Sequence, residues 1–264
     1  MKVAVCQLNS RDDRAANLSE ARRLLRQAAD AGADFAVLPE LVDYLGRRRG
    51  EPAAETVDGE FGQFFSDVAR ELNLWVLAGS FRERAFDGER AHNTSLLFDR
   101  SGVRVAAYRK VHLYDVEISG KVSYAESKTI APGEELVVAD VEGVPVGLSI
   151  CYDLRFPELY RALVTGGARL VIVPAAFTLH TGKDHWHTLL RARAIENQLY
   201  VLAPGQVGRS HGDRACWGKS SIFDPWGALL AEAPDRECVV VAEIDLAWQD
   251  KVRRELPCLS HRRL

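Results

Sequence analysis

Three polar residues stand where predicted strands of the chain end, and their chemical types complement one another. Cys151 follows the apolar run 146–150, Glu40 follows the run 35–39, and Lys110 ends the segment 103–109. Runs of this kind are typical of buried strands, so we expect each side chain at the carboxyl end of a strand, where ligand sites of α/β proteins gather. Together a thiol, a carboxyl and an amine supply a nucleophile, an acid–base partner and a cation.

This set of side chains predicts a cysteine hydrolase that works by acyl transfer. The Cys151 thiolate attacks a carbonyl carbon, Glu40 moves the thiol proton to the leaving amine, and water activated by Glu40 cleaves the thioester. Lys110 and the backbone N–H of Tyr152 are expected to stabilise the oxyanion, by roughly 3–4 kcal/mol for each donor. The segment after Cys151 predicts the first turn of a helix, whose N-terminus would favour the thiolate over the thiol.

Each of the three residues also has an ordinary structural interpretation. Glu40 would then be an acid at a helix N-terminus, and Lys110 a solvated charge. A buried cysteine usually serves as a small apolar residue. Cys151 differs because Tyr152 and Asp153 follow it directly, which is unusual unless the strand opens into a site. The apolar interpretation is kept for the other four cysteines, Cys6, Cys216, Cys238 and Cys258.

Other kinds of site compete with this one. A papain-like pair of cysteine and histidine stays open, because the chain has 7 histidines, although none stands in a motif of its own. His180, His185 and His187 lack the spacing of a zinc-binding helix, so capping and surface roles are favoured. Residues 212–220 miss the phosphate-loop spacing by one residue and lead into a strand. We therefore predict neither a metal nor a cofactor.

The composition is that of an ordinary globular protein. Of 264 residues, 47% are apolar and 27% charged, which suits one large α/β domain or two small ones. The formal net charge of −3 argues against a nucleic-acid partner. The 5 cysteines are odd in number and form no Cys-x-x-Cys pair, which indicates free thiols in a reducing compartment.

The first residues enter a predicted strand at 3–8 at once. They show no signal-peptide pattern, and no apolar segment of the chain is long enough to cross a bilayer. We expect a cytoplasmic protein whose partner is a small-molecule amide and which binds neither nucleic acid nor membrane.

The elements that must position the three residues alternate between helices and strands. Helical periodicity predicts helices at 17–31, closed by Gly32, and at 61–73. Residues 111–136 are rich in turn formers and are predicted as a long loop, which in a compact domain is usually functional. Strands are predicted at 3–8, 35–38, 75–81, 93–98 and 103–108.

The second half of the chain repeats this pattern in outline. Residues 158–175 run helix, Gly-Gly-Ala, strand and proline, as residues 20–40 run helix, Ala-Gly-Ala, strand and proline. Each half thus resembles a β-helix-β unit, and the two could be related by a pseudo-twofold axis. Weak internal similarity of this kind also occurs in α/β proteins without such symmetry. With a helix at 184–198 and strands at 144–150, 199–203, 220–223 and 238–244, we predict one domain over residues 1–264.

Three sequence blocks resemble the signature blocks of the nitrilase (carbon–nitrogen hydrolase) superfamily. They are Leu-Pro-Glu at 38–40, Tyr-Arg-Lys-Val-His-Leu at 108–113, and the ten residues 150–159 around Cys151. The resemblance implies an α/β fold, a four-layer α-β-β-α sandwich of two mixed sheets related by a pseudo-twofold. It places Glu40, Lys110 and Cys151 on the catalytic positions of the family, and Glu126 on a second glutamate that holds the lysine and the substrate.

Finer features resemble the branch that contains amidases acting on deaminated glutathione and the ω-amidases. Segments 112–121, 181–186 and 191–198 carry this likeness, and segment 206–227 favours the deaminated-glutathione group, although Lys219 replaces its histidine. We expect Arg155, one turn after Cys151, to bind a substrate carboxylate. Tyr152, Phe177 and Thr181 are also assigned to substrate binding.

The resemblance implies at least a homodimer. Two other functions remain open beside an amidase for deaminated glutathione. One is an ω-amidase for α-ketoglutaramate or α-ketosuccinamate, and the other is a catalytically silent, oligomeric interaction module. The presence of Glu40, Lys110, Glu126 and Cys151 argues against the silent module.

Overall fold

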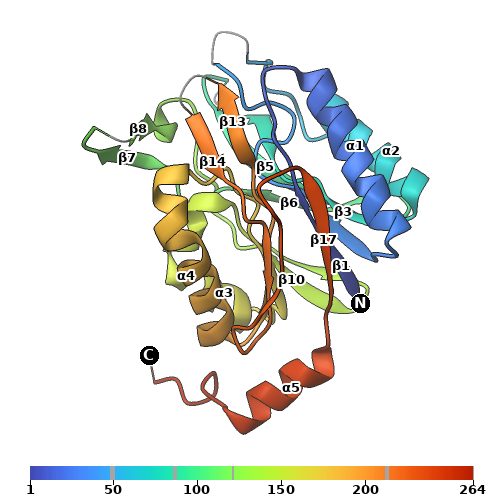
Figure 1. Cartoon of the computed structure of the whole chain (residues 1–264), viewed down its shortest axis with the longest axis vertical. Coiled ribbons are helices and arrows are strands. Elements are labelled where there is room, and N and C mark those ends of the chain that lie inside the picture. The colour runs from blue at the N-terminus through green and yellow to red at the C-terminus, as the bar shows by residue number, and fades with distance from the viewer. Residues whose placement is uncertain (48–50, 86–87, 121, 212–213, 264) are drawn as a thin grey trace.

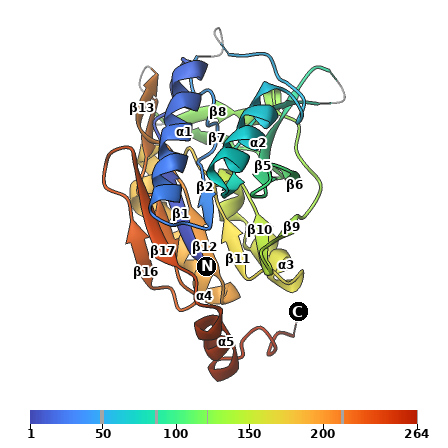
Figure 2. The same ribbon diagram turned by 90° about the vertical axis from the view of Figure 1, so that its right-hand side faces the viewer.

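Two β-sheets pack face to face, and helices cover the outer face of each (Figures 1 and 2). The computed structural model describes residues 1–47, 51–85, 88–120, 122–211 and 214–263. The four layers, α-β-β-α, are those of the predicted fold class. Lys121 and Gly212, which belong to two of the sequence segments discussed above, lie outside the described residues.

The first sheet is built around three parallel strands. These are β1 (Lys2–Gln7), β2 (Phe35–Val37) and β3 (Trp75–Leu77). Antiparallel strands flank them: β17 (Cys238–Glu243) beside β1, and β5 (Ala91–Phe98) beside β3. β5 in turn pairs with β4 (Phe81–Arg84) and β6 (Arg104–Arg109).

The second sheet repeats this order. Its parallel strands are β10 (Val144–Leu148), β11 (Leu170–Ile172) and β12 (Tyr200–Ala203). Antiparallel β9 (Val138–Val141) flanks β10, and β15 (Ser221–Phe223) followed by β16 (Leu229–Glu232) flanks β12. β1 and β10, and β2 and β11, thus occupy equivalent places, as the internal repeat predicted, and the structure adds β3 and β12 as a third pair.

Helices connect the parallel strands within each half. α1 (Arg14–Asp30) and α2 (Glu60–Leu72) lie on the first sheet, and α3 (Pro157–Thr165) and α4 (Leu179–Asn197) on the second. Asp13 caps α1 by accepting a hydrogen bond from the backbone N–H of Ala16, at 3.0 Å, so this helix begins before the predicted position. In the described part of the chain, no helix combines the length and the apolar character needed to span a membrane.

The parallel strands are buried on both faces. In β1, Val3 and Val5 pack into the core between the sheets, while Ala4 and Cys6 pack against α1 and α2. This alternation follows from the period of two in a strand. Because one core draws on both sheets, it supports our proposal that residues 1–264 form a single domain.

Two hairpins lie outside the main sheets, at the end of the molecule away from α5 (Leu246–Glu255) (Figure 1). One pairs β7 (Asp115–Ile118) with β8 (Val122–Ala125), and the other pairs β13 (Val207–His211) with β14 (Arg214–Trp217). The prediction of a continuous loop at 111–136 was therefore wrong. A two-stranded hairpin with largely exposed side chains buries little apolar surface, so its hydrophobic pattern is weak.

Candidate active site

Cys151 lies where β10 turns into a short 3-10 helix, Cys151–Arg155. Its φ of 47° is in the left-handed region, which a residue with a side chain seldom adopts. The backbone N–H of Cys151 donates to the carbonyl of Pro174, at 2.9 Å, and this bond ties the turn to the end of β11. The strained turn thus presents the sulfur beyond the carboxyl end of the sheet.

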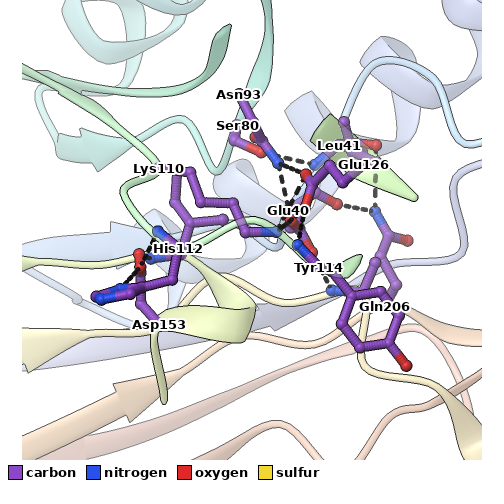
Figure 3. Close-up of polar contacts among 12 residues, drawn as sticks. Glu40, Leu41, Ser80, Asn93, Lys110, His112, Tyr114, Glu126, Asp153 and Gln206 are labelled. Carbon is purple, nitrogen blue, oxygen red and sulfur yellow. Dashed lines mark hydrogen bonds and ion pairs between the residues drawn. The ribbon is translucent and has the colours of Figure 1, made fainter. Parts of the chain in front are cut away.

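Glu40 follows β2, and its carboxylate is buried and hydrogen-bonded at both oxygens (Figure 3). Oε1 accepts from Asn93 Nδ2 at 2.9 Å and from Lys110 Nζ at 3.0 Å, and Oε2 accepts from the backbone N–H of Ala176 at 2.8 Å. Gly79 fits against this turn because a Cβ there would stand 2.0 Å from the carbonyl oxygen of Pro39. The turn therefore fixes the orientation of the carboxylate.

Lys110 lies between two glutamates and is only 2% exposed. Its Nζ donates to Glu40 Oε1 at 3.0 Å and to Glu126 Oε2 at 2.9 Å. Glu126 opens a 3-10 helix after β8, and its Oε2 also accepts the backbone N–H of Tyr114, at 2.7 Å (Figure 3). Nζ also donates to Glu126 Oε1 at 3.2 Å, so the three N–H groups of the ammonium face three carboxylate oxygens.

Burial and charge set the protonation of these groups. Burial raises the pKa of Cys151 well above its ordinary value, and the neighbouring Glu40 carboxylate, to which the thiol is hydrogen-bonded, raises it further. Burial opposes ionisation of Glu40, but the charge and hydrogen bond of Lys110 outweigh it and lower the pKa of Glu40. Burial likewise opposes the charge on Lys110, yet the two glutamates raise its pKa well above the usual value.

The predicted stabilisation of the thiolate by a helix N-terminus was therefore wrong for the free protein. Only a short 3-10 helix follows Cys151, whereas a buried carboxylate contacts the thiol directly. The resting site holds a thiol next to an ionised carboxylate, an arrangement in which the base takes the proton during attack.

Asp153 joins the turn of Cys151 to the strand end of Lys110. Its fully buried carboxylate accepts from the hydroxyl of Tyr108 at 2.7 Å and from the backbone N–H of Ile150 at 2.8 Å. It also accepts from the backbone N–H of His112 at 3.0 Å and contacts His112 Nδ1 at 2.8 Å (Figure 3). Tyr108 and His112 flank Lys110, so one carboxylate sets the position of both elements.

Asp153→Ala is expected to lower the free energy of unfolding by about 3 kcal/mol or more, because it leaves several buried donors without an acceptor. Tyr108→Phe, the matched control, removes one of these donors and should have a clearly smaller effect. Urea denaturation of both variants tests this. An unfolding free energy of Asp153→Ala within about 1 kcal/mol of wild type would contradict the role of Asp153.

These groups open into a cavity of about 630 Å³, within the range of small-molecule sites. Cations outnumber carboxylates on its wall, since Arg155, Lys183 and Arg214 join Lys110 there, against Glu40 and Glu126. All eight residues assigned from the sequence line this cavity: Glu40, Lys110, Glu126, Cys151, Tyr152, Arg155, Phe177 and Thr181.

Arg155 lies over two aromatic rings of this cavity. Its guanidinium is 5.2 Å from the ring centre of Phe177 and 5.8 Å from that of Tyr152, and Nη1 is 3.2 Å from His185 Nδ1. Thr181 lies in the first turn of α4, where its hydroxyl is 2.8 Å from that of Thr178. Aromatic stacking holds a guanidinium in a fixed plane, which suits the recognition of a planar anion.

Lys219, the departure from the branch pattern, is not on the cavity wall. Its Nζ pairs with Asp235 at 2.9 Å, and its carbonyl accepts from Trp186 Nε1 at 2.8 Å. Among the described residues, no group of three or more histidine, cysteine or acidic side chains is arranged to hold a metal ion.

Sequence reasoning missed three residues that shape the site. Asn93 donates to Glu40, and Gln206 Nε2 donates to the carbonyl of Glu40 at 3.0 Å. Arg214, on β14, lines the cavity from the second hairpin. The one sequence signal for Asn93 was its place as a polar residue at the start of an apolar strand. The sequence around Gln206 and Arg214 carried no comparable signal.

Comparison with known proteins gives a consistent result. The family model described as Carbon-nitrogen hydrolase matches residues 2–254. The deaminated glutathione amidase of Homo sapiens is 42% identical over 99% of this chain and 82% of its own length. The omega-amidase NIT2 of Homo sapiens is 35% identical over 99% of this chain and 95% of its own length.

Solved structures of the family have the same fold as this chain. The NitFhit protein of C. elegans superposes with a TM-score of 0.91 at 39% identity. The match covers 99% of this chain and 65% of that protein, so the chain spans about two thirds of NitFhit. The resemblance inferred from the three sequence blocks is thereby confirmed. The chain belongs to the carbon-nitrogen hydrolase family and is a hydrolase of carbon–nitrogen bonds.

Proposed function

We propose that this amidase hydrolyses deaminated glutathione, without a cofactor, through a thioester on Cys151. The observation that carries the proposal is the contact between the Cys151 thiol and the ionised Glu40 carboxylate, with Lys110 beside them, at the wall of a cavity. A nucleophile hydrogen-bonded to its base is the arrangement that acyl transfer requires.

In the first half-reaction, Cys151 Sγ attacks the carbonyl carbon while its proton passes to Glu40. Glu40 then delivers this proton to the amide nitrogen, the C–N bond breaks, and the amine leaves the thioester behind. The raised pKa of Cys151 and the lowered pKa of Glu40 support this order, because the proton is still on sulfur when the substrate arrives.

In the second half-reaction, Glu40 removes a proton from water. The resulting hydroxide attacks the thioester carbonyl, the C–S bond breaks, and the proton on Glu40 returns to sulfur. One carboxylate thus serves as base and acid in both halves.

The oxyanion needs donors on the side of the carbonyl oxygen. We assign this role to the ammonium group of Lys110 and to the backbone N–H of Tyr152. The amide of Cys151 itself is engaged by Pro174. Tyr152 is the second residue of its 3-10 helix, and the first N–H groups of a helix have no acceptor within it. Glu126 holds Lys110 in place for this contact.

Charge supports a substrate with carboxylates. The excess of cations on the cavity wall is unfavourable in a partly enclosed site unless an anion binds there. Deaminated glutathione carries one carboxylate on each side of the scissile amide, whereas an ω-amide of a keto acid carries one.

We further propose a cytoplasmic homodimer or larger homo-oligomer. Five free cysteines support a reducing compartment. Exposed apolar side chains support self-association, namely Ile195 on α4 with Trp226 and Leu256, which are 48%, 57% and 50% exposed.

The test is a turnover screen that separates the proposed function from its alternatives. Deaminated glutathione, α-ketoglutaramate, an N-carbamoyl amino acid and an uncharged amide of similar size are compared by kcat/KM. Preference for deaminated glutathione is expected. Preference for α-ketoglutaramate would favour an ω-amidase, and absence of turnover from all four would favour the silent interaction module.

Arg155→Lys is expected to lower kcat/KM for carboxylated amides by about 1.5–3 kcal/mol, although it keeps the charge. An ammonium group cannot reproduce the two parallel hydrogen bonds of a guanidinium. The uncharged amide is the control and should change little. Equal losses on charged and uncharged amides would rule out a carboxylate contact at Arg155.

A further inference from the structure

Arg214 and Arg155 line the same cavity but come from different elements. It begins β14, and its guanidinium is 5.4 Å from the ring centre of Tyr124 on β8, with a side-chain hydrogen bond between the two residues. Arg214 therefore bridges the two hairpins, β7–β8 and β13–β14, which project at the same end of the molecule (Figure 1). Arg155 lies instead beside α4, through His185.

Neither cavity arginine forms an ion pair with a carboxylate in the part of the chain that the structure describes. No aspartate or glutamate of the described residues lies within 4.0 Å of the guanidinium of Arg155 or Arg214. Elsewhere in the molecule arginines pair closely, as Arg109 does with Glu83 at 2.6 Å and Arg169 with Asp250 at 2.6 Å. An arginine that an aromatic ring holds at a cavity wall, and that pairs with no acid among the described residues, is suited to a planar anion that arrives with the ligand.

The position of β14 tells which part of a substrate Arg214 faces. Arg214 and Cys216 are two residues apart on one strand, so their side chains share a face. Cys216 packs in a small cluster with Ala176 and Leu41, which lie directly beside Glu40. Arg214 thus belongs to the Glu40 side of the cavity.

Glu40 protonates the leaving amine in the mechanism proposed above, so the amine portion of the substrate must pass on that side. From these contacts we infer that Arg214 binds a second substrate carboxylate, carried by the amine portion, while Arg155 binds the carboxylate of the acyl portion. This inference rests on the proposed function and deepens it. It makes Arg214 the residue that selects amides with an anion on both sides of the scissile bond.

The two candidate substrate classes differ in this feature. The amine portion of deaminated glutathione ends in the carboxylate of a glycine. The amine portion of α-ketoglutaramate is ammonia and carries none. Arg214 therefore favours the first class over the second, whereas Arg155 acts on both.

The experiment compares kcat/KM of wild type and Arg214→Gln on three substrates. They are deaminated glutathione, the same compound with a glycinamide in place of the terminal glycine, and α-ketoglutaramate. Arg214→Gln should lose roughly 10- to 150-fold on deaminated glutathione, as expected for one charge-assisted contact, and less than about threefold on the other two. Wild type itself should prefer deaminated glutathione to its glycinamide by a similar factor.

Two further variants serve as controls. Arg209→Gln removes one charge from the exposed face of the same hairpin and should leave all three values unchanged. Arg214→Lys keeps the charge but lacks the two parallel N–H donors of a guanidinium. Its kcat/KM should fall by an intermediate factor on deaminated glutathione and stay unchanged on the other two substrates.

Three outcomes would overturn the inference. One is equal loss of Arg214→Gln on all three substrates, and another is no loss on any of them. The third, which needs no variant and so holds even if Arg214→Gln fails to fold, is equal kcat/KM of wild type for deaminated glutathione and its glycinamide. Failure of the proposed function looks different, because wild type would then not turn over deaminated glutathione at all.

Discussion

Replacing Cys151 by alanine is expected to abolish amide hydrolysis, with a loss in kcat of roughly 10⁴-fold or more. The physical reason is that no other group can form the acyl intermediate. Glu40 and Lys110 would still polarise a bound amide, but water lacks the position that the strained turn gives the sulfur. The rate of ammonia or amine release, measured with a saturating substrate, tests this.

The matched control for Cys151→Ala is Cys6→Ala. Both thiols are buried and have a raised pKa, yet Cys6 lies on β1 in the layer facing α1 and α2, outside the cavity. Cys6→Ala should lose some stability through a small cavity and keep kcat nearly unchanged. Residual turnover of Cys151→Ala above a few per cent of wild type would rule out the thioester mechanism.

The three candidate residues at strand ends were predictable because the signal is local. Apolar runs that stop at Glu40, Lys110 and Cys151 are visible in the sequence. The strands before them, β2, β6 and β10, belong to two sheets, whose packing brings the three ends together. The same periodicity predicted most strands and helices of both halves, since strands buried on two faces and amphipathic helices between them leave strong patterns. Glu126 came from the family resemblance alone, because the hairpin before it was not recognised.

The rest of the site depends on contacts between distant parts of the chain. Asp153 follows Cys151 in sequence, but its function arises from Tyr108 and His112, which the fold brings to it. Arg214 stands in a short hairpin, and Tyr124, whose ring its guanidinium contacts, belongs to another hairpin. The hydrophobic periodicity of a sequence carries no signal for a contact between two such hairpins.

The protonation of Cys151 was mispredicted for the same reason. Sequence showed a turn into a helix, and a helix N-terminus lowers the pKa of a thiol. Burial and the charge of Glu40 raise the pKa of Cys151 instead, and both come from the tertiary structure. This difference changes the expected pH dependence, because the base, and not a preformed thiolate, then limits activity in acid.

Glu40→Gln is expected to lower kcat by roughly 10²–10⁴-fold or more, because the amide of glutamine cannot carry the proton in either half-reaction. In wild type the pKa of Glu40 lies below its ordinary 4.5, so Glu40 is ionised at neutral pH. Activity should therefore be lost only as the pH falls through that lowered pKa. Glu83→Gln is the control. Like Glu40, Glu83 is buried and paired with a cation, here Arg109, but it lies outside the cavity. It should cost stability with little change in kcat.

The same substitution should also lower the pKa of the Cys151 thiol. Removing the negative charge of Glu40 leaves the thiol beside Lys110 alone, whose charge lowers the pKa of the thiol. Thiolate absorbance of Glu40→Gln, corrected with the Glu40→Gln/Cys151→Ala double variant, should therefore rise at lower pH than in wild type. Slower turnover together with easier thiolate formation is what loss of a general base predicts. Turnover within tenfold of wild type, or an unchanged titration, would show that Glu40 does not take the proton of Cys151.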